Sequence, residues 1–194
     1  MKKPFDRNEF AKLVPQVELI GDTAIREGVI RAWELAYADS AFEDFNCRFS
    51  CEYDGSITLP QHMRSVAQRS YDCARQIIAE YGFELRLDYV LAIALVHDLC
   101  KLRDNVPVGD TVDKSDDGHQ MPHAFFSAFY ALNAGLPTEI ASGALTHSHH
   151  TKKVPTCLEA VIVSYMDLTE TDVFRWIWGR ELNIEAIHKD PRLC

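Results

Sequence analysis

The stretch LDYVLAIALVHDLCK at residues 87–101 decides the fold of this chain. Its segment from Tyr89 to Val96 is almost wholly apolar, and a helix that is apolar all round belongs in a core. His97 and Asp98 close this segment, so an imidazole and a carboxylate stand where the apolar packing ends. An isolated buried charge is strongly unfavourable. The pair therefore needs a partner, and a metal ion meets that need.

The rest of the chain predicts an all-α fold. Apolar residues recur at helical spacing, and caps or breakers bound each run. The helices we expect cover residues 6–20, 23–39, 60–82, 87–101, 122–133, 138–148 and 155–180. Residues 41–60 predict a loop or a short extended segment, and the turn residues of 102–121 predict a loop. No stretch of any length alternates apolar and polar residues as a strand does.

Length, composition and net charge limit the kinds of protein that this chain can be. The 194 residues suit one domain, and a hydrophobic content of 47% supports a real core. A net charge of -9 argues against binding to a nucleic-acid polymer. The chain shows neither a targeting signal nor a segment long enough to span a bilayer, and we read its six cysteines as reduced thiols. We therefore expect a cytoplasmic protein that acts on a small molecule.

Residues able to bind a metal recur at the ends or interiors of the predicted helices. This candidate set is His62, His97, Asp98, His123, His147 and Asp167. Each one alone is as well explained by core packing or helix capping, but their joint placement is not. Ligands carried on several helices converge when those helices bundle. Neighbours on a helix point about 100° apart, so one side chain can bind an ion while Asp98 bridges to a second.

Other histidines compete for these roles. His119 precedes His123 in the loop, while His149 and His150 closely follow His147. Any of the three could replace an assigned ligand or contact a substrate. His188 lies near the terminus outside any motif, and we expect it to be solvated.

Several segments together resemble a known family, the HD domain superfamily of metal-dependent phosphohydrolases. The resemblance covers residues 57–175, and LVHDLCK at 95–101 is similar to its His-Asp-x-x-Lys signature, with Cys100 where glycine is usual. The other matching segments are LPQH at 59–62, the run from His123 to AGLP at 134–137, LTHS at 145–148, PTCLEA at 155–160 and YMD at 165–167. It implies a single helical bundle over residues 57–194, with an N-terminal helical extension over 1–56.

The resemblance also implies a dinuclear metal site. His62, His97, Asp98 and Asp167 would hold the first of two divalent ions. His123 and His147 would hold the second, with Asp98 as the bridge. Mixed nitrogen and oxygen ligands suit iron, manganese or another transition metal, and the sequence does not choose among them.

The resemblance implies a hydrolase that uses metal-activated water on a small anionic substrate, by default a phosphate ester or nucleotide. Asp98 and Lys101 would be catalytic, and Arg64, Lys101 and His150 would bind substrate, with Lys152 and Lys153 near the pocket mouth. Residues 102–121 are placed to act as a lid. The alternatives are a dinuclear-iron oxygenase that cleaves a C–C or C–P bond, a hydrolase of a non-phosphate substrate, and a non-catalytic nucleotide-binding module.

Overall fold

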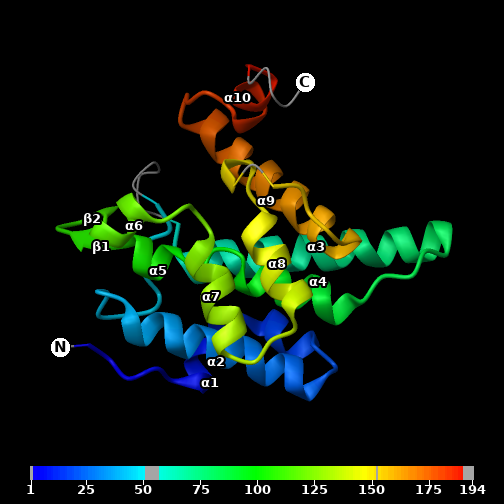
Figure 1. Ribbon diagram of the computed structural model, residues 1–194, viewed down its shortest axis with the longest axis horizontal. Helices are drawn as coiled ribbons and strands as arrows, with labels where there is room; N and C mark the ends of the chain where they lie inside the picture. The colour runs from blue at the N-terminus through cyan, green and yellow to red at the C-terminus, as the bar shows by residue number, and fades with distance from the viewer. Residues whose placement is uncertain (1, 51–56, 152, 190–194) are drawn as a thin grey trace.

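The computed structural model describes residues 2–50, 57–151 and 153–189, and it confirms the all-α class. Figure 1 shows helices arranged around α4 (Leu87–Val96), with one small hairpin at the edge. The other α-helices are α1 (Arg7–Leu13), α2 (Thr23–Asp39), α3 (Leu59–Tyr81), α5 (Lys101–Asp104), α6 (Asp116–Gln120), α7 (Phe125–Asn133), α8 (Thr138–Thr146), α9 (Leu158–Ile177) and α10 (Asn183–Lys189). Two short 3-10 helices are η1 (Pro15–Leu19) and η2 (His149–Thr151).

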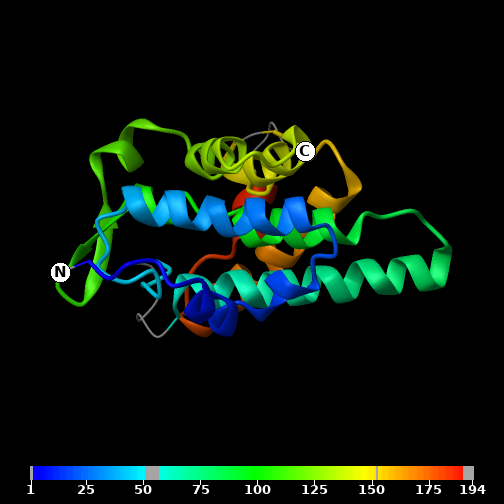
Figure 2. The same ribbon diagram turned by 90° about the horizontal axis from the view of Figure 1, so that it is seen from below.

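Helix α4 is the centre of the fold. Every residue from Val90 to Val96 is 0% exposed, as the wholly apolar run predicts. Helices α2, α3, α8 and α9 all pack against α4, and Figure 2 shows α2 and α3 as two long, separate rods. No helix among the described residues has both the length and the apolarity to cross a bilayer.

The N-terminal segment packs directly on this centre. The indole Nε1 of Trp33, on α2, donates to the carbonyl oxygen of Leu95 at 2.8 Å, and Trp33 is fully buried. Helix α2 also contacts α7. The division into an extension over 1–56 and a bundle over 57–194 stays a proposal.

The N-terminal helix predicted over 6–20 is wrong in one respect, because it is broken. Val14, at φ -130° and ψ 63°, separates α1 from η1. A proline disfavours the helical conformation of the residue before it, and Pro15 follows Val14. The helix predicted over 60–82 is confirmed, and Gly82 ends α3 in the left-handed conformation at φ 68°.

The loop predicted over 102–121 is also wrong. Strands β1 (Asn105–Val108) and β2 (Thr111–Lys114) form an antiparallel hairpin, and α5 and α6 flank it. Gly109 opens its two-residue turn at φ 58°, a positive value that glycine adopts without strain. The strands are only four residues each, and Pro107 lies in one of them, so no alternation was visible.

The remaining helix bounds shift slightly. The helix predicted over 87–101 ends at Val96, and the His-Asp pair lies in the turn that follows. Helix α7 begins at Phe125 because Ala124 has a left-handed φ of 68°. Helix α9 is shorter than predicted at both ends, and α10 was not predicted.

An ion pair between a half-exposed arginine and a buried glutamate fixes the start of α9 against the start of α4. Glu159 is 5% exposed, and its carboxylate accepts from the backbone N–H of Arg86 at 3.1 Å and from Arg86 Nε at 3.0 Å. Burial alone would raise the pKa of Glu159, but the hydrogen bonds from Arg86 outweigh burial and lower this pKa to about 2. This pair lies outside the site described next.

Candidate metal centre

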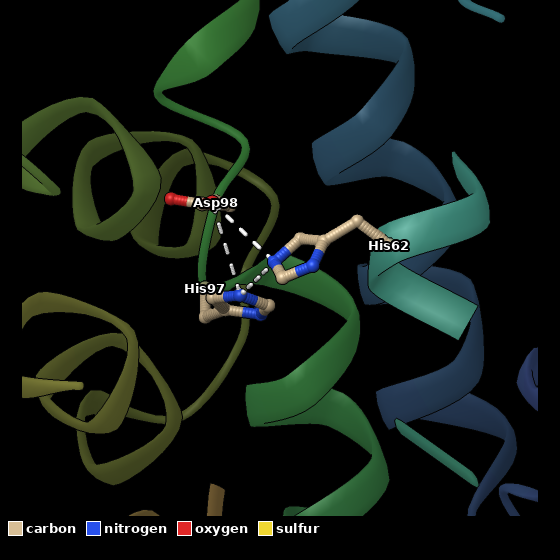
Figure 3. A group of neighbouring side chains, drawn as sticks. All are labelled: His62, His97 and Asp98. Carbon is tan, nitrogen blue, oxygen red and sulfur yellow. Dashed lines mark hydrogen bonds and ion pairs between the residues drawn. The ribbon is translucent and has the colours of Figure 1, made fainter. Parts of the chain in front are cut away.

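The fold brings the candidate ligands to one place by ending or interrupting helices there. His62 lies in the first turn of α3, Asp167 lies within α9, and His147 directly follows α8. His97 and Asp98 follow α4. Figure 3 shows His62 and His97 pointing toward each other beside Asp98. His123, just before α7, completes the set.

Four of these side chains surround a common point: His62, His97, Asp98 and Asp167. The Nε2 atoms of His62 and His97 are 3.2 Å apart. Asp167 Oδ1 lies 3.3 Å from the Nε2 of His62 and 3.7 Å from that of His97. Asp98 Oδ2 lies 3.6 Å and 4.0 Å from the same two atoms. Ligands about 2.1 Å from one ion stand roughly 3.0–4.2 Å apart, so these spacings fit one metal ion.

The orientation of the imidazoles also fits a metal. His97 Nδ1 lies 2.8 Å from the carbonyl oxygen of Ala94, and His62 Nδ1 lies 3.3 Å from a Glu170 oxygen. A proton on each Nδ1 leaves the two Nε2 lone pairs facing each other. Asp167 Oδ1 is buried there without a hydrogen-bond partner among the described residues. These electron pairs need a shared cation, and the residues present therefore fit a divalent ion.

The other oxygen of Asp98 faces a second group. Asp98 Oδ1 lies 3.5 Å from His123 Nε2 and 3.7 Å from His147 Nε2. His147 Nδ1 is 2.6 Å from the carbonyl oxygen of Ala144, which again directs a lone pair on Nε2 toward Asp98. Asp98 thus contacts one pair of histidines with each of its oxygens, which is the geometry of a bridging carboxylate.

Burial and charge set the ionisation of these groups. Burial lowers the pKa of His147 to about 3, so its imidazole is neutral. Burial alone would raise the pKa of Asp98, but Lys101 and the neighbouring histidines hold that pKa well below its usual range. Neutral imidazoles and ionised carboxylates are the forms that bind metals. Burial also opposes a positive charge on His62, but the carboxylates of Asp167 and Glu170 outweigh burial and raise the pKa of His62 to about 9. The surroundings of His62 therefore favour a positive charge.

A cavity of about 830 Å³ opens over these side chains. The sequence-assigned residues that line it are Asp98, Lys101, His123, His147, His150 and Asp167. His62 and His97 are fully buried and do not line it. The hairpin borders the cavity through Asn105 and Lys114, which lie in the segment predicted to act as a lid.

The predicted substrate role of Arg64 finds no support in its position. Arg64 Nη1 donates to the carbonyl oxygen of Leu13 at 3.2 Å, and Arg64 does not line the cavity. Two residues along a helix turn a side chain by about 200°, so Arg64 points away from the side of α3 that carries His62.

The competing histidines occupy different positions. His119 is exposed on α6, and His150 lies with its ring 6.1 Å from that of His123. His188 is exposed and also lines the cavity, together with Lys153. Lys152 and the side chain of His149 lie outside the described residues.

Sequence reasoning missed two side chains that contact His62. Glu170 faces its Nδ1, and Phe49 stacks on its ring with centroids 4.0 Å apart and planes at 27°. Glu170 follows Asp167 by one turn of a helix, a spacing that could have revealed it. Phe49 comes from a segment with no regular period, so only the tertiary structure reveals it. Burial raises the pKa of Cys100 well above its usual value, which favours a packing role for this thiol over that of a thiolate ligand.

Comparisons with known proteins show the family of this chain. The sequence profile of the HD domain matches residues 60–172. A dihydroneopterin 2',3'-cyclic phosphate phosphodiesterase from Methanocaldococcus jannaschii is 26% identical over 122 residues, which cover 62% of this chain and 48% of that protein. The chain thus spans about half the length of this relative. No solved structure matches the chain. The profile match covers more than half of the chain and includes all six candidate ligands. The chain therefore belongs to the HD domain superfamily of metal-dependent phosphohydrolases.

Proposed function

We propose that this protein is a metal-dependent phosphohydrolase with two ions in its site. The observation that carries the proposal is the position of Asp98, whose two oxygens face two different pairs of histidines. The relative from Methanocaldococcus jannaschii is a phosphodiesterase of a cyclic phosphate, which supports the same class of reaction.

The residues would divide between the two ions as follows. The first ion would be held by His62, His97, Asp98 and Asp167, and the second by Asp98, His123 and His147. Divalent ions bound there supply Lewis acidity and a water activated for attack on phosphorus. The donors are imidazole nitrogens and carboxylate oxygens, which suit iron or manganese.

The charges around the cavity favour an anionic substrate. Apart from Asp98 and Asp167, the ionised side chains among the described residues that line the cavity are all basic: Lys101, Lys114, Lys153 and Arg175. The chain as a whole carries a net charge of -9, so this concentration of positive charge is local. A local cluster of cations attracts and orients an anion such as a phosphate group.

Apolar side chains also line the cavity. They include Phe49, Tyr165, Ile184 and Ile187, and the last two come from α10. Pockets of about 300–1,000 Å³ bury small organic ligands. We therefore propose that the substrate is a phosphate ester of a sizeable, partly apolar organic group.

A substrate panel tests this function. The protein is stripped with a chelator, then assayed with Mn²⁺, Fe²⁺ or no metal on a phosphomonoester, a linear phosphodiester, a 2',3'-cyclic nucleotide and an uncharged carboxylic ester. We expect metal to restore hydrolysis of at least one phosphate ester, while the carboxylic ester stays intact. Metal-restored hydrolysis of the carboxylic ester alone would instead indicate a non-phosphate substrate and contradict the proposal.

A further inference from the structure

Both ring nitrogens of His62 lie close to carboxylates from one helix, α9. On α9, Asp167 Oδ1 lies 3.3 Å from Nε2, and Glu170 Oε2 lies 3.3 Å from Nδ1. Neither His62 Nδ1 nor Glu170 Oε2 has a hydrogen-bond partner among the described residues, and the 3.3 Å ion-pair contact is what joins the two atoms. Because Nε2 faces the other candidate ligands, Glu170 stands behind His62 and is not itself placed as a ligand.

Glu170 is held in turn by a cation on α3. Its Oε1 lies 2.6 Å from Arg69 Nη2, and Arg69 also donates to Ser65 Oγ. Glu170 is 5% exposed, so water competes little for its oxygens. Arg69 follows His62 by about two helical turns on the same helix. The chain of contacts from His62 through Glu170 to Arg69 therefore ties α3 to α9 beside the metal centre.

Two of the other candidate ligands, His97 and His147, have uncharged partners behind them, whereas His123 Nδ1 lies 3.9 Å from Asp104 Oδ2. The Nδ1 atoms of His97 and His147 donate to neutral main-chain carbonyl oxygens. A hydrogen bond to a carboxylate fixes the tautomer of a metal-binding histidine and makes the other nitrogen a stronger donor. Phe49, stacked on the ring, leaves the imidazole little freedom to turn.

We infer that Glu170, clamped by Arg69, is a positioning residue that holds His62 in the tautomer and orientation needed to bind the first ion. The inference rests on the proposed metal centre but assigns a role to residues outside the ligand set.

Metal affinity tests this inference without reference to turnover. Apo protein is titrated with Mn²⁺ by calorimetry, for the wild type and for Glu170→Gln. We expect at least one Mn²⁺ dissociation constant to rise by about 10–100-fold in Glu170→Gln. The matched control is Glu159→Gln, since Glu159 is equally buried on α9 and paired with Arg86. Its Mn²⁺ affinity should stay within about twofold of wild type.

A second variant tests the same role if Glu170→Gln does not fold. Arg69→Met keeps Glu170 but removes its clamp, and it should weaken Mn²⁺ binding by a smaller factor of about 3–10-fold. Circular dichroism and thermal melting are recorded for all three variants. If the wild type binds no Mn²⁺, the proposed function itself fails. If the wild type binds Mn²⁺ and Glu170→Gln binds it equally well, or if Glu159→Gln weakens binding to the same extent, the positioning role is wrong.

Discussion

Replacing Asp98 with alanine is expected to lower kcat/KM by at least about 10³-fold and to remove both metal ions from the purified protein. Its two oxygens face different histidine pairs, at 3.6 Å and 4.0 Å on one side and 3.5 Å and 3.7 Å on the other. Loss of this carboxylate therefore removes a ligand from both positions at once. Metal content is measured by mass spectrometry on protein purified without added metal.

His123→Ala is the matched comparison for Asp98→Ala. His123 contacts Asp98 only on the side of the second position, so His123→Ala should lose one ion and keep the other. Both variants should retain the helical circular dichroism spectrum of the wild type. Equal residual metal in the two variants would contradict the bridging role of Asp98.

Replacing Lys101 with methionine is expected to lower kcat/KM by about 10²-fold while metal content stays unchanged. Lys101 lines the cavity, its ammonium lies 5.1 Å from the centre of the Phe49 ring, and its charge acts on Asp98. Placed there, the ammonium can stabilise negative charge that develops on a phosphate. Methionine keeps much of the side chain's length and apolar packing but removes this charge.

Lys12→Met is the control for Lys101→Met. Lys12 is exposed on α1 and does not line the cavity, so its removal changes the net charge of the protein equally without touching the site. Its kcat/KM should match that of the wild type. A loss of metal in Lys101→Met as large as its loss of activity would assign Lys101 to metal retention and contradict a role in charge stabilisation.

The central helix and the positions of several candidate ligands along the chain could be predicted because they follow from one-dimensional patterns. A helix that is apolar on every side can only be buried, which places α4 in the core and His97 and Asp98 at its edge. Asp167 was recognisable by the same logic, since its carboxylate interrupts an apolar run, whereas His62 opens a helix and was assigned through the family resemblance. The family resemblance then predicted how the ligands divide between two ions, a division that stays a proposal.

Features that depend on side-chain direction or on short strands were harder to predict. Arg64 shares a helix with His62, but helical geometry turns it toward Leu13. The hairpin β1–β2 consists of strands of four residues in a segment rich in turn residues, so local propensity favoured a loop. Phe49 reaches His62 from a segment without period, and no local rule predicts such a contact.

The most direct test of metal-dependent hydrolysis compares turnover of one phosphate ester with and without dioxygen, in ¹⁸O-labelled water. We expect equal rates under aerobic and anaerobic conditions, and one labelled oxygen from water in the phosphate product. Both results follow if the proposed metal centre would supply an activated water for attack on phosphorus. Product that forms only with dioxygen and iron, or phosphate that carries no label from water, would contradict hydrolysis and point to an oxygenase.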